Sequence, residues 1–325
     1  MGTTGGAGAT GRLLRELGRE LRDAGLHGSF LVRDLGTGDE VGIGPDIEFP
    51  TASLVKVPLA LATLERVALG ELDGATVLEV PPGRITTFGP TGMSRFRHPA
   101  HIAVDDLLYL AVCISDEAAA GALFRLTPPA EVAAVLDRLG VRGITVRHRT
   151  GELVDTPAER FDAADAHLAH ALAIDAGTPG RGHRVPQLDI SRANTGTARA
   201  FVDLLQAIWR AGPDEADATG AHAGEPSPIR PEVATRLREL LANNLLRQRL
   251  APDFTSDLTT WSSKTGTLLN LRHEVGVVEH ADGRAYAVAA LTESRVPASR
   301  QPGAEALMGQ VARRLRDHLR SGPTG

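Results

Sequence analysis

The chain has almost no cysteine and no long apolar run, and these absences exclude several classes of protein. Its 325 residues include one cysteine, Cys113, which excludes an intramolecular disulfide and a cysteine-based zinc site. No apolar run approaches the roughly 20 residues that a membrane-spanning helix needs. A net charge of −5 gives no basic surface for nucleic acid. We therefore expect a soluble protein without a membrane or nucleic-acid partner, and the lack of a basic cluster followed by an apolar stretch in residues 1–10 favours a cytoplasmic location.

Lysine is also scarce. Of the 35 lysine and arginine residues, only Lys56 and Lys264 are lysines. Arginine stays charged at any working pH, whereas a desolvated lysine can lose its proton, so positions that retain lysine can be those that need this chemistry. Chance retention is the alternative, and the surroundings of the two lysines decide between these interpretations.

The two ends of the chain predict an antiparallel sheet with packing helices. Apolar residues at helical spacing predict amphipathic helices at residues 12–25 and 304–319. Short β-rich runs separated by glycine-containing turns predict two hairpins. Their strands are expected at residues 29–33, 41–43, 271–280 and 284–292.

The middle of the chain has mostly helical patterns. They cover residues 53–69, 103–126, 130–139, 162–174, 197–210 and 231–249. Segments 175–190 and 211–231, dense in Gly, Pro, Asp and Ala, are typical of loops. The simplest architecture is an α+β fold in which an antiparallel sheet, flanked by the terminal helices, carries an inserted all-helical domain. We place the sheet domain at 1–50 plus 255–325 and the insert at 51–254, with the active site between them.

Ser53 and Lys56 stand at the start of the first helical segment of the insert. Residues 53–69 are apolar almost all round, which is typical of a helix buried at the centre of a protein. Residues three apart share one helix face, so the lysine amine can reach the serine hydroxyl. Burial lowers a lysine pKa, and a neutral amine beside a hydroxyl is a general base beside a nucleophile. The alternative is an accidental Ser-x-x-Lys with a surface lysine.

A second polar group, Ser115-Asp116-Glu117, interrupts an apolar helical pattern. Three adjacent polar residues in such a stretch must be hydrogen-bonded or face a cavity. The Ser115 hydroxyl can pass a proton between a lysine and a leaving group. The alternative is a junction between helices, with Ser115 or Asp116 as an N-cap.

A third motif, Lys264-Thr265-Gly266-Thr267, follows residues 259–263, a β-branched and aromatic run that predicts a strand. A lysine on a strand that faces a cleft supplies positive charge, and the hydroxyls at 265 and 267 can bind a carboxylate. Gly266 allows a substrate to approach the backbone.

The three motifs in this order resemble those of class A β-lactamases and penicillin-binding proteins. Both lysines fall on motif positions, and the resemblance covers nearly the whole chain. It implies a serine hydrolase that forms an acyl-serine intermediate, with Ser53 as nucleophile and with Lys56 and Ser115 as proton carriers. It also implies an oxyanion hole formed by the backbone N–H groups of Ser53 and Thr267.

The resemblance further implies an anion site for a small-molecule substrate. Lys264 and the hydroxyls of Thr265 and Thr267 would hold an anionic group of the substrate. Arg272 follows this strand closely enough to help bind a carboxylate. We expect no cofactor, and we assign no metal because no set of three ligands is patterned in the sequence.

Two residues depart from the family pattern. Family members usually have asparagine where Glu117 stands, and an ionised carboxylate there would repel a substrate carbonyl and favour the charged form of Lys56. An equally open alternative is that Glu117 pairs with an arginine. In the segment expected to carry the deacylating glutamate, Thr150 takes that position. Glu152 is a possible replacement base, although a salt bridge to a nearby arginine is an alternative.

These observations favour a serine hydrolase that acts on a β-lactam or a small carboxylate-bearing ester or amide, with deacylation in doubt. The alternative, motivated by Glu117 and Thr150, is a β-lactamase-like binding protein or antibiotic-biosynthesis accessory protein with weak or no turnover. A cell-wall peptidase is a third reading, but it requires export of the chain.

Overall fold

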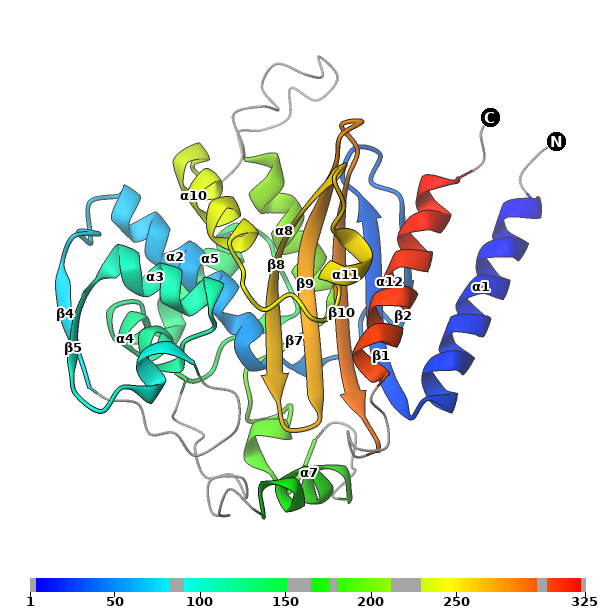
Figure 1. The fold of residues 1–325 in the computed structure, drawn as a ribbon. Coiled ribbons are helices and arrows are strands. Elements are labelled where there is room, and N and C mark those ends of the chain that lie inside the picture. The colour runs from blue at the N-terminus through cyan, green and yellow to red at the C-terminus, as the bar shows by residue number, and fades with distance from the viewer. Residues whose placement is uncertain are drawn as a thin grey trace.

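A five-stranded antiparallel sheet forms the centre of the protein. The computed structural model describes residues 4–81, 91–150, 165–175, 181–211, 229–296 and 303–322. The strand order is β2-β1-β10-β9-β8, so β8 lies at one edge (Figure 1). The strands are β1 (Leu26–Asp34), β2 (Glu40–Ile43), β8 (Thr259–Leu268), β9 (Leu271–His280) and β10 (Ala285–Ser294). The predicted hairpins from the two ends of the chain thus join in one sheet, through the pairing of β1 with β10.

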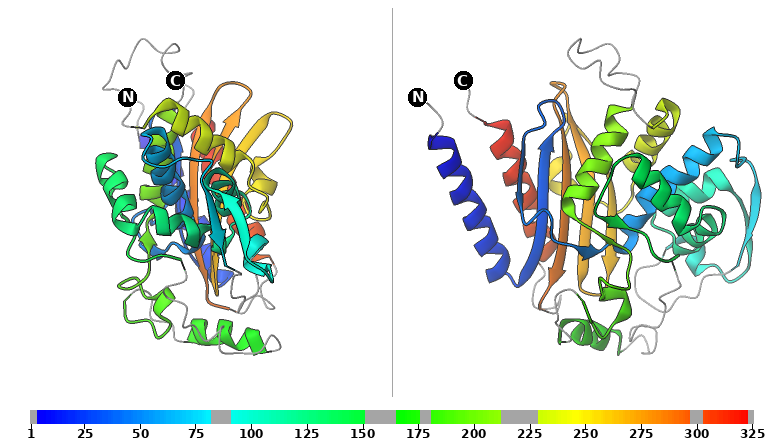
Figure 2. Two further views of the ribbon diagram at one scale, coloured as in Figure 1. Left: turned by 90° about the vertical axis from the view of Figure 1, so that its left-hand side faces the viewer. Right: turned by 180° about the vertical axis from the view of Figure 1, so that it is seen from behind.

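Helices cover both faces of this sheet. The terminal helices α1 (Thr4–Asp23) and α12 (Ala304–Arg320) pack on one face, and α8 (Ala198–Arg210) packs on the other (Figure 2). Side chains that alternate along a strand point to opposite faces of a sheet. In β10, Val288 and Ala290 accordingly join the core under the terminal helices, whereas Ala289 and Leu291 join the core shared with the helical part of the chain.

The helical part lies beside the edge strand β8. Its helices are α2 (Lys56–Ala68), α3 (Val104–Cys113), α4 (Glu117–Leu126), α5 (Pro129–Arg138), α7 (Ala166–Asp175) and α10 (Pro231–Ala242). The short helix α11 (Ala251–Phe254) lies apart from them and packs against β8 and α12. Short 3-10 helices and strands complete it: η1 (Ala52–Val55), η2 (Gly92–Arg95), η4 (Pro186–Leu188), β3 (Phe49–Pro50), β4 (Val77–Val80), β5 (Ala100–Ala103), β6 (Ile144–Thr145) and β7 (Thr195–Gly196). Helix α2 is buried over most of its length, as its apolar sequence predicts.

The α+β fold class is confirmed, but two predicted helices are shorter than expected. The segment 103–126 is two helices, because Ser115 has a φ of 60° between them and breaks the helical path. The segment 231–249 is helical only to Ala242. The side chain of Asn244 accepts from the Leu246 N–H at 3.0 Å and donates to Ser263 of β8 at 3.1 Å, and such local bonds compete with helix continuation.

The two predicted domains pack closely against each other, and elements of one contact the sheet of the other. Helix α8 lies within the predicted insert, yet it packs against β1 and β10 of the sheet. The boundaries 1–50 plus 255–325 and 51–254 therefore stay a prediction. Most of the predicted loop at 211–231 lies outside the described residues. Within the described ranges, no helix is both long and apolar enough to cross a bilayer.

A buried carboxylate on β9 ties the sheet to the chain segment before α11. Glu274 is fully buried and accepts hydrogen bonds from Trp261 Nε1 at 2.9 Å, Ser263 Oγ at 2.7 Å and the Leu250 N–H at 2.8 Å. Burial raises the pKa of this carboxyl. We call Glu274 and these three donors the Glu274 cluster.

His273, the neighbour of Glu274 on β9, is also fully buried. Its Nδ1 accepts from the Thr292 N–H at 3.1 Å, which leaves the proton on Nε2 to be donated to the Pro50 carbonyl at 2.9 Å. Burial lowers the pKa of His273 to about 4. The ring therefore connects the sheet to the short strand β3 that precedes the Ser53 helix.

Candidate active site

Ser53 sits in the 3-10 turn η1, which packs directly against β8. The Thr51 N–H donates to the Asn194 carbonyl at 2.8 Å, and Ala52 has a φ of 47°, so the chain turns sharply just before the serine. A Cβ atom placed on Gly266 would lie 3.0 Å from the Thr51 carbonyl oxygen. The missing side chain of Gly266 therefore makes room for the serine turn, and the approach of a substrate to the Gly266 backbone stays a prediction. Ser53 itself is half-buried and therefore open on one side.

Asp116 builds the junction between α3 and α4. It is fully buried, caps α4 by accepting from the N–H groups of Ala118 and Ala119, and accepts from the Met93 N–H and the Ser94 hydroxyl of η2. The junction predicted as an alternative for this motif is therefore present, with Asp116 as the N-cap. Ser115 and Glu117 flank this buried N-cap in the sequence, and both contact Lys56.

The side chain of Lys56 is completely buried and lies among four oxygens. Its Nζ is 3.1 Å from Ser53 Oγ, 2.7 Å from the Ser115 carbonyl, 3.2 Å from Ser115 Oγ and 2.5 Å from Glu117 Oε1. The predicted approach of amine and hydroxyl is thus present, and a surface lysine is excluded. Glu117 pairs with Lys56, so the alternative in which it pairs with an arginine is wrong.

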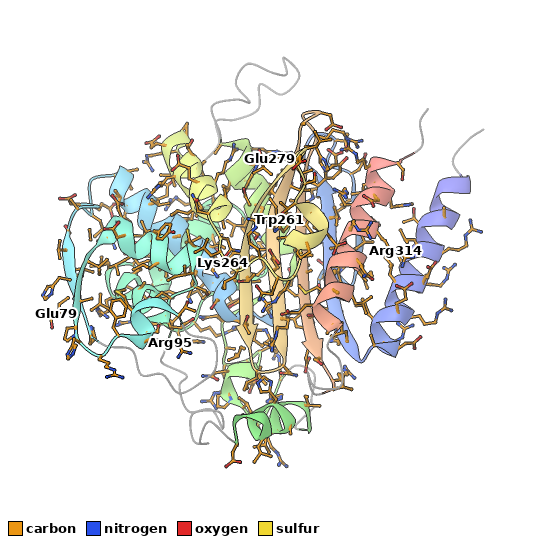
Figure 3. The ribbon with its side chains drawn as sticks, in the orientation of Figure 1. Glu79, Arg95, Trp261, Lys264, Glu279 and Arg314 are labelled. Atoms are coloured by element: carbon orange, nitrogen blue, oxygen red, sulfur yellow. The ribbon has the colours of Figure 1, made fainter. Side chains whose placement is uncertain are left out.

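Lys264 lies on β8, close to the helical part of the chain (Figure 3). It contacts Ser115, as Lys56 does. Its Nζ donates to Ser115 Oγ at 3.0 Å and to the Thr265 carbonyl at 2.9 Å. Burial, together with the positive charge of Lys56, lowers the pKa of Lys264 well below its usual range. The only two lysines of the chain therefore meet at one hydroxyl, between the sheet and the helical part.

Arg249, which lies outside every motif, supports the far end of β8. It is 2% exposed and donates to the Gly266 carbonyl at 2.9 Å, the His273 carbonyl at 2.8 Å and Thr267 Oγ1 at 2.6 Å. Because the Thr267 hydroxyl accepts from Arg249, its own proton is free to be donated to an anion. Sequence reasoning missed Arg249, since nothing in the sequence separates it from the many other arginines.

The other two residues of the predicted anion site are less open. Thr265 is 1% exposed, and its Oγ1 has no hydrogen-bond partner among the described residues. Arg272 donates to the carbonyls of Leu269 and Leu271 at 2.6 and 2.7 Å, and Glu305 Oε1 of α12 lies 3.7 Å from its Nε. Thr267 is therefore the exposed hydroxyl of the motif, while Arg272 is already engaged by the backbone.

Of the two residues considered for deacylation, the structure describes Thr150 only. Thr150 Oγ1 is buried and has no hydrogen-bond partner in the described part of the chain. Glu152 lies outside the described residues. Arg147, a nearby arginine, donates to the Ala193 carbonyl at 2.7 Å and to Thr195 Oγ1 at 3.1 Å.

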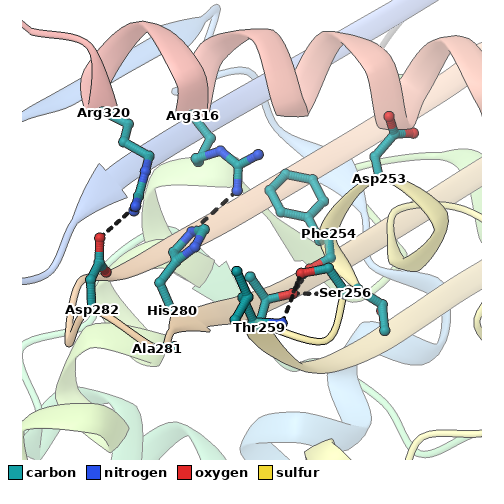
Figure 4. Close-up of a pocket in the computed structure, with 11 residues that line it drawn as sticks. Asp253, Phe254, Ser256, Thr259, His280, Ala281, Asp282, Arg316 and Arg320 are labelled. Atoms are coloured by element: carbon teal, nitrogen blue, oxygen red, sulfur yellow. Dashed lines mark hydrogen bonds and ion pairs between the residues drawn. The ribbon is translucent and has the colours of Figure 1, made fainter.

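A separate pocket of about 520 Å³ lies at the other end of β8 and contains none of the motif residues (Figure 4). Its walls are the end of α11, the turn from α11 into β8, the turn after β9 and the end of α12. Arg316 donates to His280 Nε2 at 3.2 Å, and Arg320 pairs with Asp282 at 2.5 Å. The charged side chains of this pocket are thus paired within the protein.

Comparison with known proteins identifies the family of this chain. A sequence model of the Beta-lactamase enzyme family matches residues 12–319. The chain belongs to this family. The Beta-lactamase regulatory protein BlaB of Streptomyces cacaoi is 70% identical over 309 residues, which are 95% of this chain and 97% of that protein.

Several solved structures share the fold of this chain. TLA-3 extended-spectrum β-lactamase superposes with a TM-score of 0.71 at 16% identity, over 95% of this chain and 99% of that one. An acyl-enzyme complex of a PBP-A variant with penicillin G gives 0.69 at 17% identity, over 96% and 97%. The β-lactamase of Sphaerobacter thermophilus also gives 0.69, at 18% identity, over 96% and 99%. The predicted resemblance to class A β-lactamases is confirmed.

Proposed function

We propose that this protein is a ligand-responsive member of the β-lactamase family whose Ser53 forms an acyl bond with a β-lactam or a small carboxylate-bearing ester or amide, and that this acylation serves the control of β-lactamase production. The observation that carries the proposal is the half-buried Ser53 hydroxyl, 3.1 Å from the buried amine of Lys56. The regulatory assignment is supported by the name of the relative that is 70% identical.

The site contains the parts that acyl transfer requires. Ser53 Oγ attacks the substrate carbonyl, and the bond from that carbonyl carbon to the leaving nitrogen or oxygen breaks. The Ser115 hydroxyl, which touches both lysines, can deliver a proton to the leaving group. Thr267, held by Arg249, can donate to the substrate carboxylate. The N–H groups of Ser53 and Thr267 stay the predicted oxyanion donors.

A long-lived adduct suits a regulatory role. Thr150 occupies the position expected for the deacylating glutamate, and its hydroxyl is enclosed. A neutral hydroxyl is a weak base for the activation of water. We therefore expect an acyl-enzyme that forms faster than it hydrolyses, so that ligand occupancy persists.

Intact-mass spectrometry tests the acylation. The protein is incubated with benzylpenicillin, a cephalosporin and an activated ester, and the mass is followed over time. We expect a one-to-one adduct in the wild type and none in Ser53→Ala. Absence of an adduct with all three probes contradicts the proposal.

A second function, binding without acylation, is favoured by one observation. The 2.5 Å ion pair with Glu117 gives Lys56 a partner that competes for its role as a base. This alternative predicts that Ser53→Ala binds the same probes with unchanged affinity in calorimetry and that the wild type shows no mass change.

A further inference from the structure

The structure restricts which group can take the proton of Ser53. Lys56 Nζ faces a carboxylate oxygen at 2.5 Å and a carbonyl oxygen at 2.7 Å, neither of which carries a proton to give. A positive charge on this nitrogen is stabilised by the adjacent carboxylate in a buried setting, where attraction between opposite charges is strong. An ammonium has three protons and no lone pair. In this form Lys56 donates to Ser53 and accepts nothing.

Glu117 accepts the hydrogen bond of the Ser53 hydroxyl. Ser53 Oγ donates to Glu117 Oε1 at 3.1 Å, while the same Ser53 oxygen accepts from Lys56 at 3.1 Å. Within the described ranges no other acceptor contacts the Ser53 hydroxyl. The Glu117 side chain is 43% exposed, so it lies on the open side of the site where a substrate arrives.

The position of Glu117 is fixed by the fold. It is the first residue of α4, directly after the N-cap Asp116, which is buried and holds four donors. A carboxylate in the first turn of a helix is also favoured by the helix dipole. Asparagine, the usual residue of the family here, has no basic oxygen of comparable strength. The substitution to glutamate therefore adds a base at the nucleophile.

We propose that Glu117 is the catalytic base of this site, and that Lys56 is a charged relay that connects Glu117 with Ser115. This inference rests on the proposed acylation of Ser53. The Ser53 proton passes to Glu117 as the bond between Ser53 Oγ and the acyl carbon forms. When the leaving group departs, it takes the Ser115 proton, Ser115 takes one from the Lys56 ammonium, and Lys56 takes one from Glu117. All side chains return to their starting state, and one proton has moved from Ser53 to the leaving group.

The direction of one rate change tests this role. The acylation rate is measured by quenched intact-mass analysis with benzylpenicillin and an activated ester, in the wild type, Glu117→Gln, Glu117→Asn and Glu117→Asp. We expect both amide variants to acylate at least about 100-fold more slowly than the wild type, as loss of a general base predicts. The aspartate variant, which keeps a carboxylate, should recover part of the rate.

Glu131→Gln is the matched control, because Glu131 is an exposed glutamate in the first turn of α5 and lies in no motif. It should leave the acylation rate unchanged. Circular dichroism and thermal melting test whether each variant is folded. If Glu117→Gln unfolds, Glu117→Asn, which carries the usual residue of the family, decides the test alone.

The remaining outcomes separate the two proposals. If the wild type forms the adduct and either amide variant forms it equally fast or faster, Glu117 is not the base, whereas the acylation of Ser53 stands. If only the amide variants form an adduct, Glu117 blocks the site, and both proposals are wrong for the wild type. If no variant and no wild-type protein is labelled, both proposals are likewise overturned.

Discussion

Two polar clusters, each built around a glutamate that accepts hydrogen bonds, differ in how far that glutamate is exposed. In the Glu274 cluster, a fully buried carboxylate accepts from three fixed donors, and the surrounding core closes it off. In the active site, the carboxylate of Glu117 contacts Ser53 and Lys56 while 43% of its side chain stays exposed. Exposure of the carboxylate to solvent therefore distinguishes the candidate active site from the Glu274 cluster.

The largest contrast is expected from Ser53→Ala. Loss of the nucleophile should reduce acylation by at least about a thousandfold. The folded state should keep its stability within about 0.5 kcal/mol, because a half-buried hydroxyl is replaced by a hydrogen. Intact mass and urea unfolding measure the two effects, with the exposed Ser321→Ala as control. A large loss of stability would show that the active-site cluster also holds the fold.

The reverse pattern is expected from Glu274→Ala. Removal of this carboxylate leaves three buried donors unsatisfied, so the free energy of unfolding should fall by about 4 kcal/mol. Urea unfolding measures the change. Glu279→Ala, on the same strand but only partly buried, should change it by about 0.5 kcal/mol or less. Equal effects of the two variants would remove the distinction between the clusters.

A pH effect of about 3 kcal/mol is expected from the buried ring of His273. Its pKa is about 4 in the folded protein and 6.5 in the unfolded chain, so the unfolded state binds a proton first as the pH falls. Stability from this residue is present above pH 6.5 and is lost between pH 6.5 and 4, by about 3 kcal/mol in total. Urea unfolding of the wild type and His273→Gln at several pH values measures it. A wild-type advantage that does not shrink below pH 6.5 contradicts the assignment.

The smallest effect is expected at the end of β8. Thr267→Val removes one charge-assisted hydrogen bond to a substrate carboxylate, so the concentration of benzylpenicillin that gives half-maximal acylation should rise about tenfold. The methyl ester of the same probe lacks the carboxylate and should be affected by less than about twofold. Equal changes with both probes would show that Thr267 does not contact the carboxylate.

The motifs predicted the fold class and the meeting of distant residues, because their residue types and order are specific. Lys56, Ser115 and Lys264 come from three separate parts of the chain, and both lysines hydrogen-bond to the Ser115 hydroxyl. The direction of the Glu117 side chain was not predictable in this way. It depends on the N-cap at Asp116 and on the left-handed backbone of Ser115, which periodicity does not reveal.

The supporting residues were harder to predict than the motif residues. Arg249 is significant only because its guanidinium reaches the backbone of two strands, which is a property of the folded chain. The end of α10 depends on a bond from Asn244 to Ser263, a contact 19 residues away along the chain. Glu274 follows Arg272 and His273 directly in its strand, and charged residues are mostly found at the surface.

Ala52 and Ser115 both have positive φ angles, and they lie beside Ser53 and between the two lysines. Residues with a Cβ atom pay roughly 1–2 kcal/mol for this conformation, whereas glycine does not. The backbone is therefore strained at two positions that border the candidate active site, where glycine would relieve the strain. A glycine at either position would relieve this strain and stabilise the fold. The same change would loosen the backbone that aligns the Ser53 hydroxyl with Glu117.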